Sequence, residues 1–120
     1  MSQKILVIDD DPSVLRYLQT LLTDHGYDVT TAPDGVDGMK ALEKNDFDLI
    51  TLDLEMNKQW GPQFFRAISK NPAWKGIPVV VISGLSRPDL AIKNAAAVIG
   101  KPFESSEVLD AVARLLSGAK

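Results

Sequence analysis

The sequence contains no cysteine, which excludes a disulfide framework and a thiolate metal site. No apolar run approaches the roughly 20 residues that a membrane-spanning helix needs. Basic residues are not in excess, because the formal net charge is −3, and this argues against binding of nucleic acid or of a membrane surface. Nothing resembles a signal peptide, since Lys4 is followed by only four apolar residues before three aspartates. We therefore expect a cytoplasmic protein.

The length and the hydrophobic content indicate one compact domain over residues 1–120. Short apolar runs alternate with segments of helical period, which is typical of βα units on a parallel sheet. The runs are continuously apolar, as expected when helices cover both faces of the sheet. The predicted strands are, in chain order, residues 4–9, 27–31, 48–53, 77–83 and 95–100.

Helix signals are clear along the chain except before the last predicted strand. Asp11 is a candidate N-cap for the first helix, and Pro12 can occupy its first position, where the missing N–H is not needed. We expect Ser105 or Ser106 to cap the last helix. The stretch 84–94 has little periodicity, so the helix between the fourth and fifth strands should be short or irregular.

Polar residues suited to phosphoryl chemistry follow four of the predicted strands. The acidic run Asp9–Asp11 closes the first strand, and Asp53, Ser83 and Lys101 close three others. In an open α/β sheet, ligands bind beyond the carboxyl ends of the strands. Carboxylates, a hydroxyl and an ammonium that are spread over 92 positions can thus meet in one shallow pocket. Crowded carboxylates repel one another, and a hard divalent cation relieves that repulsion.

Each of these residues also has a simpler interpretation. The aspartates before Pro12 can merely cap the first helix and complement its dipole. Asp53 can be a solvated residue at the start of a loop, Ser83 a satisfied hydroxyl and Lys101 an exposed charge. Together these interpretations require four coincidences at one edge of the sheet, so the sequence favours a functional site.

Four segments resemble the receiver domain of two-component response regulators, and the resemblance covers the whole chain. It implies a doubly wound α/β fold with helices on both faces of a five-stranded parallel sheet, in the flavodoxin-like order 2-1-3-4-5. The segments that carry the resemblance are Ile5–Asp11, Asp48–Met56 with Gly61 downstream, Pro78–Gly84 and Lys101–Phe103.

The resemblance implies a phosphoacceptor and a magnesium site. Asp53 matches the phosphoacceptor of the family. A carboxylate suits this role, since it can attack a phosphoryl group and form an acyl phosphate. Asp9 and Asp10 match the acidic pair that holds Mg²⁺. The implied ligands are Asp10, Asp53 and the backbone carbonyl of Glu55, whereas Asp9 acts mainly through water.

The resemblance also assigns two residues that contact the phosphoryl group. Lys101 matches a lysine whose ammonium reaches the phosphoryl oxygens, and the family usually holds the bond to the following Pro102 in the cis form. Ser83 matches the hydroxyl that senses a phosphoryl oxygen.

The implied function is that of a phosphoacceptor switch, which catalyses its own phosphorylation and dephosphorylation and turns over no metabolite. A sensor histidine kinase or a phosphotransfer protein would donate the phosphoryl group with Mg²⁺ as cofactor. An unknown output protein would receive the signal, and we expect a monomer or a weak dimer.

The chain departs from the family pattern in several places. Val98 stands where the family usually has a switching aromatic residue, and Asn57 replaces a usual proline. The segment from Ser83 to Lys101 is about one helical turn shorter than usual. In the family, the residue two positions after the one matched by Ser83 tunes hydrolysis of the acyl phosphate. Here it is Leu85, which cannot orient the attacking water by hydrogen bonding, and this predicts a long-lived phosphoryl group. We expect output through a different or reshaped face.

Two alternatives stay open at this point. A degenerate receiver could serve only as a docking module. A small phosphatase of the haloacid dehalogenase type would use Asp9 as nucleophile and Asp11 as general acid, with a later strand-end hydroxyl and a lysine.

Overall fold

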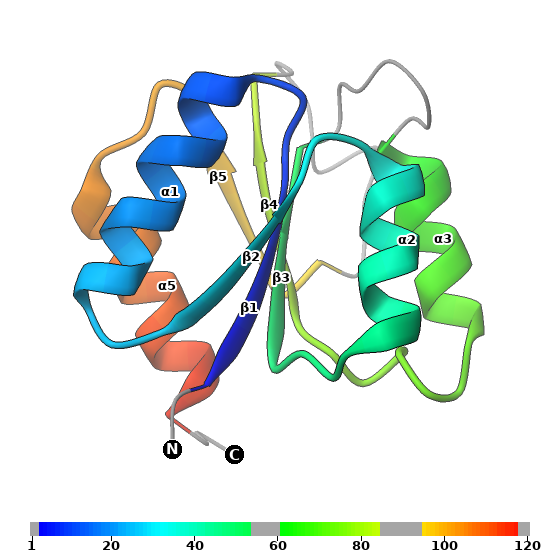
Figure 1. Ribbon diagram of the computed structural model, residues 1–120. Coiled ribbons are helices and arrows are strands. Elements are labelled where there is room, and N and C mark those ends of the chain that lie inside the picture. Colours follow the sequence, from blue (N-terminus) through cyan, green and yellow to red (C-terminus); the bar gives the residue numbers. More distant parts are fainter. Residues whose placement is uncertain (1–2, 54–60, 85–94, 118–120) are drawn as a thin grey trace.

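Strands and helices alternate along the chain, as the sequence predicts (Figure 1). The computed structural model describes residues 3–53, 61–84 and 95–117. Most of the predicted helix at 84–94 therefore lies outside the described residues. The described elements are β1 (Lys4–Ile8), α1 (Pro12–Asp24), β2 (Asp28–Ala32), α2 (Gly35–Lys44), β3 (Leu49–Leu52), α3 (Gly61–Lys70), β4 (Val79–Ser83), β5 (Ala97–Gly100) and α5 (Ser105–Leu116).

The strands form one parallel sheet in the order β2-β1-β3-β4-β5, which confirms the expected topology. Helices α1 and α5 cover one face, and α2 and α3 cover the other (Figure 1). All the strands are slightly displaced or shorter than predicted, because flanking residues join the ladder by single hydrogen bonds. Asp9, for example, donates its N–H to the carbonyl of Ala32 at 3.2 Å, and Asp53 donates to that of Ile8 at 3.0 Å.

The core lies on both faces of the three central strands. On β1, Ile5 and Val7 belong to the cluster under α1 and α5, while Leu6 and Ile8 belong to the cluster under α2 and α3. All four residues of β3 are buried as well. Burial on both faces explains why these strands are continuously apolar in the sequence.

The start of α1 is capped as predicted, and the start of α5 is not. Asp11 accepts a hydrogen bond from the Ser13 N–H at 2.9 Å, and Pro12 follows it in the first turn. The N-cap of α5 is Glu104, so the expectation of Ser105 or Ser106 was wrong. The reason is a capping box, in which the carboxylate of Glu107 accepts the Glu104 N–H at 2.8 Å.

Gly38 lets α2 approach the sheet closely, and a side chain here should destabilise the fold. A Cβ atom at this position would lie 2.7 Å from Cδ1 of Ile8 and 3.4 Å from the ring of Phe64, both of which are buried. We expect Gly38→Val to lower the free energy of unfolding by about 1–3 kcal/mol, measured by urea denaturation. Gly76→Ala is the control, since nothing lies within 4 Å of its Cβ position. Equal stability of the two variants would contradict this packing.

Candidate functional site

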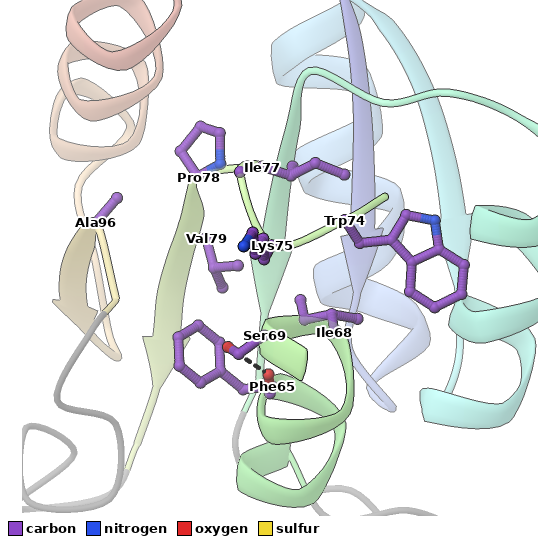
Figure 2. A pocket seen from close by; sticks show the side chains of 10 residues that line it. Phe65, Ile68, Ser69, Trp74, Lys75, Ile77, Pro78, Val79 and Ala96 are labelled. Carbon is purple, nitrogen blue, oxygen red and sulfur yellow. Dashed lines mark hydrogen bonds between the residues drawn. The ribbon is translucent and has the colours of Figure 1, made fainter. Parts of the chain in front are cut away.

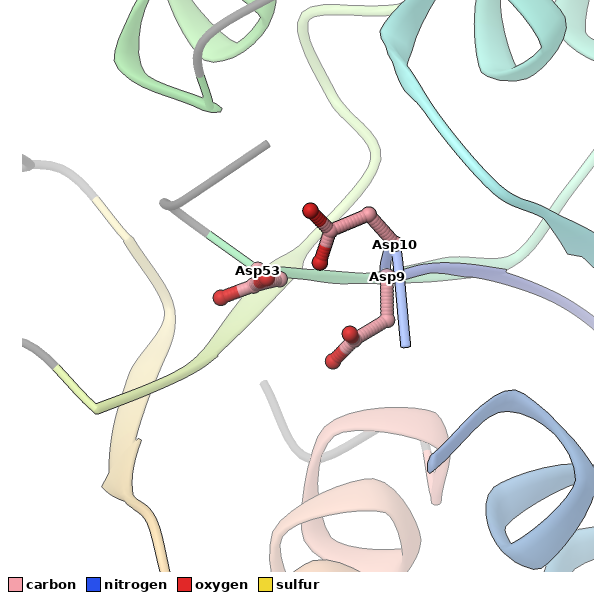
Figure 3. A group of neighbouring side chains, drawn as sticks. All are labelled: Asp9, Asp10 and Asp53. Carbon is pink, nitrogen blue, oxygen red and sulfur yellow. The ribbon is translucent and has the colours of Figure 1, made fainter. Parts of the chain in front are cut away.

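Three carboxylates converge at the carboxyl edge of the sheet (Figure 3). Asp9 and Asp10 follow β1, and Asp53 follows β3. These strands are neighbours in register, with Ile8 opposite Leu52, so the residues that follow them emerge side by side. The candidate ligand oxygens of the three aspartates all lie within 4.8 Å of one another.

Two of these carboxylates are buried, and Asp9 has both of its oxygens occupied. Asp9 is 2% exposed and Asp53 is 3% exposed, whereas Asp10 is partly exposed. Oδ1 of Asp9 accepts the N–H of Asp11 at 3.0 Å, and Oδ2 accepts from Nζ of Lys101 at 2.7 Å. Burial of a carboxylate requires such partners.

Lys101 reaches the site because β5 lies beside β4. Its N–H donates to the carbonyl of Ser83 at 3.0 Å, and its Nζ atom lies 3.7 Å from Oδ1 of Asp53. The peptide bond from Lys101 to Pro102 is cis, as the resemblance implies. One ammonium thus stands between two of the three carboxylates, and the group keeps a formal charge of −2.

The surroundings keep Lys101 charged. Partial burial alone would lower the pKa of Lys101, but the hydrogen bond to Asp9 and the charges of Asp9, Asp53 and Asp11 outweigh it and raise the pKa above 10.5. The ion pair therefore stabilises the fold fully below the unfolded pKa. That contribution is lost only as the pH rises through the higher folded pKa.

The Lys101 ammonium and a divalent cation should compete for the same carboxylates. We expect Lys101→Met to raise the affinity for Mg²⁺ about tenfold, because the variant removes a positive charge close to Asp9 and Asp53. Isothermal titration with Mg²⁺ measures this effect. Lys101→Arg keeps the charge and is the control, with an affinity near that of the wild type. An unchanged or weaker affinity of Lys101→Met would contradict the competition.

The structure shows where Ser83 and Val98 lie on their strands and how exposed they are. Ser83 ends β4 and is fully buried at the same edge of the sheet as Asp53. Val98 lies on β5 opposite Val81 and is 41% exposed. The other predicted or divergent site residues, Glu55, Asn57 and Leu85, lie outside the described residues.

The pairing of Lys101 with Asp9 was not predicted from the sequence. The resemblance assigns the lysine to the phosphoryl oxygens alone, and the two residues are 92 positions apart. The acidic run could have indicated this pair. A buried carboxylate needs a counter-charge, and Lys101 follows a strand that ends at the same edge of the sheet. Asp34, which the sequence places in a turn, is a buried carboxylate that also caps α2 by accepting the Asp37 N–H at 2.8 Å.

Comparison of the sequence with known proteins finds several relatives that match most of this chain. Rrf1 of Nitratidesulfovibrio vulgaris is 31% identical over 98% of this chain and 85% of its own length. The chemotaxis protein CheY of Treponema pallidum is 36% identical over 94% of this chain and 82% of its own length. The chain also matches the transcriptional regulatory protein GlrR of Escherichia coli at 33% identity, but it spans only 25% of that protein.

Solved structures agree with these relatives. CheY4 of Vibrio cholerae superposes with a TM-score of 0.90 at 28% identity, over 97% of this chain and all of that one. The response regulator TrrA of Thermotoga maritima, solved in complex with Mg²⁺ and BeF, gives a TM-score of 0.86 at 30% identity, over 95% of this chain and 99% of that one. The family model of the response regulator receiver domain matches residues 5–113. This chain belongs to the response regulator receiver domain family.

Proposed function

We propose that this receiver domain accepts a phosphoryl group on Asp53 and thereby changes its binding to a partner. Receiver domains are switches of two-component signalling and not metabolic enzymes. The observation that carries the proposal is the gathering of three aspartate carboxylates within 4.8 Å, with the Lys101 ammonium beside two of them. We further propose that residues 1–120 form a single receiver domain.

The acidic group fits a hard divalent cation. Receiver domains bind Mg²⁺ at an acidic pocket, and carboxylate oxygens are the ligands that this ion prefers. Asp10 and Asp53 are the proposed direct ligands, together with the backbone carbonyl of Glu55. Asp9 would act through water, because its two oxygens already accept from Asp11 and Lys101. Bound Mg²⁺ would supply charge stabilisation to the transferring phosphoryl group.

The proposed reaction is an in-line displacement at phosphorus. A carboxylate oxygen of Asp53 attacks the phosphorus of a phosphohistidine on a kinase or a phosphotransfer protein. The new O–P bond forms as the N–P bond breaks, and the imidazole leaves with the electron pair and takes a proton from solvent. Lys101 and Ser83 then donate hydrogen bonds to phosphoryl oxygens.

The burial of Asp53 and the ion pair of Asp9 with Lys101 favour this chemistry. Low exposure of Asp53 limits the access of water to the acyl phosphate. The ammonium of Lys101 is held by Asp9 at 2.7 Å, so it is already positioned when the phosphoryl group arrives. The residue Leu85, which cannot orient a water molecule, leads us to propose a long-lived phosphoryl group.

The proposed partners are those of a signalling module. A sensor histidine kinase or phosphotransfer protein would phosphorylate the domain, and an unknown output protein would respond to it, with the domain itself a monomer or weak dimer. Among the described helices, none combines the length and the apolar character needed to cross a bilayer. We propose a cytoplasmic location and no direct contact with nucleic acid or membrane.

The phosphatase alternative fits the observed contacts poorly. Asp9, its nucleophile, is paired with the Lys101 ammonium and an N–H group, and this lowers its nucleophilicity. Asp11, its general acid, caps α1 through its carboxylate. The docking-module alternative differs from our proposal only in lacking phosphorylation.

The proposal is tested by incubating the protein with Mg²⁺ and acetyl phosphate. We expect incorporation of one base-labile phosphoryl group per chain, and no incorporation when the metal is chelated. Continuous release of inorganic phosphate without a stable label would support the phosphatase. No label under any condition would leave the docking module.

A further inference from the structure

The charges of this chain are segregated along the sequence. None of the 16 acidic residues falls in the stretch 56–88, although this stretch holds five of the 13 lysines and arginines. Three of those five are described, and all three are exposed: Arg66 and Lys70 on α3, and Lys75 in the turn that follows it. We call these three residues the basic surface. It stands out on a domain with a formal net charge of −3.

The cations of the basic surface are not neutralised within the part of the chain that the structure describes. No ion pair links Arg66, Lys70 or Lys75 to a carboxylate there, whereas Lys101 contacts two. Gln63 and Ala67 are exposed beside Arg66 and Lys70 on α3 and add no charge. The basic surface therefore presents its positive charge to solvent.

A cavity lined mostly by residues with apolar side chains adjoins the basic surface (Figure 2). Its volume is about 350 Å³, and Lys75 is among the residues that line it. The hydroxyl of Ser69 donates to the carbonyl of Phe65 at 2.8 Å, so its one donor is already used. Trp74, Ile77 and Ala96 also line the cavity.

This cavity is separate from the acidic site. Its lining includes Pro78 and Val79, at the start of β4, whereas Ser83 lies at the other end of that strand, at the edge of the sheet where Asp53 follows β3. None of the lining residues is Asp9, Asp10, Asp53 or Lys101. Binding at this cavity therefore does not require phosphorylation.

We propose that the basic surface and its cavity dock a partner protein through an acidic segment that inserts one large apolar side chain. The cavity volume is at the small end of the range of about 300–1,000 Å³ for pockets that enclose a ligand, which suits a single side chain. Carboxylates beside that side chain would face Arg66, Lys70 and Lys75. Aromatic and arginine residues are enriched in the cores of protein interfaces, and this surface has both.

Other occupants fit these features less well. Nucleic acid would meet only three described cations on a domain of net negative charge, and it has no apolar side chain for the cavity. A second copy would have to bring one of its own acidic regions to this surface. Binding of DNA and self-association are measurably different from binding of an acidic peptide.

The test uses the full chain without phosphodonor and short fluorescent peptides rich in glutamate, each with one leucine, phenylalanine or tryptophan. We expect saturable binding of at least one peptide by fluorescence anisotropy. The double variant Lys70→Glu/Lys75→Glu should weaken it more than about tenfold, because like charges then face each other. Lys40→Glu/Lys44→Glu on α2 makes the same charge change elsewhere and should leave binding unchanged. Replacing the apolar residue of the peptide by alanine should also weaken binding about tenfold.

A third variant separates the contribution of the cavity from that of the basic surface. Ala96→Leu places extra bulk at the cavity without changing charge, and it should weaken the anchored peptide but not the residual binding of its alanine version. Absence of saturable binding by every peptide would overturn the proposal. Binding that survives charge reversal, equal binding of single-stranded DNA, or concentration-dependent self-association through Lys70 and Lys75 would overturn it too. Since no phosphodonor is present, a failure here leaves the phosphorylation proposal intact.

Discussion

Replacement of Asp53 by asparagine should abolish phosphoryl incorporation from acetyl phosphate, with a loss of more than about a thousandfold in rate. The amide keeps the shape of the side chain but is a far weaker nucleophile than the carboxylate. The fold should persist, because Asp53 is one of three crowded carboxylates and its removal lessens their repulsion. The measurement is the rate of label incorporation by intact-protein mass spectrometry.

The matched control for this variant is Asp46→Asn. Asp46 is an exposed aspartate outside the acidic site, so the two substitutions make the same chemical change. We expect Asp46→Asn to be phosphorylated at the wild-type rate. Full labelling of Asp53→Asn would place the phosphoryl group on another residue and would refute the assignment.

Replacement of Asp10 by asparagine should weaken Mg²⁺ binding about a hundredfold and slow phosphorylation at low Mg²⁺ in proportion. Asp10 is the partly exposed member of the acidic group, and neither of the hydrogen bonds that hold Asp9 involves it. Its loss should therefore leave the fold intact. Calorimetric titration with Mg²⁺, with the labelling rate at several Mg²⁺ concentrations, measures both effects.

Asp11→Asn separates loss of a ligand from loss of nearby negative charge. Asp11 caps α1 through its carboxylate, and asparagine is an equally good N-cap, so helix α1 should be unaffected. We expect this variant to bind Mg²⁺ within about threefold of the wild type, because an exposed charge is screened by solvent. Equal weakening by Asp10→Asn and Asp11→Asn would show that Asp10 is no direct ligand.

Much of the fold follows from patterns that local physics determines. The apolar runs at β1, β3 and β4 predict buried parallel strands because both faces of these strands are covered. Asp11 and Pro12 predict the start of α1, since an acceptor at the cap and a residue without N–H both suit that position. Glu104 was not predicted as the cap of α5, because its reciprocal bond with Glu107 competes with the serine caps.

The site was predictable to the extent that it depends on strand ends. Parallel strands end at one edge, so Asp9, Asp10 and Asp53 could be placed together from the sequence. The pairing of Lys101 with Asp9 depends on side-chain directions that no short sequence pattern encodes. The cavity beside α3 is formed by Phe65, Trp74 and other residues that individually read as core.

The segregation of acidic and basic residues along the chain is visible in the sequence, but the net charge alone does not show it. A value of −3 argues against a basic face only if charges are evenly spread. Arg66, Lys70 and Lys75 are exposed on neighbouring elements, so the charges of this chain are not evenly spread.

The most direct test of the central claim is to locate the phosphoryl group. Phosphorylated protein is reduced with borohydride, which converts an aspartyl phosphate to homoserine, and the peptides are sequenced by mass spectrometry. We predict homoserine at position 53 and none at Asp9, Asp10 or Asp11. Homoserine at Asp9, Asp10 or Asp11 with position 53 unmodified would contradict the assignment of Asp53 as the phosphoacceptor.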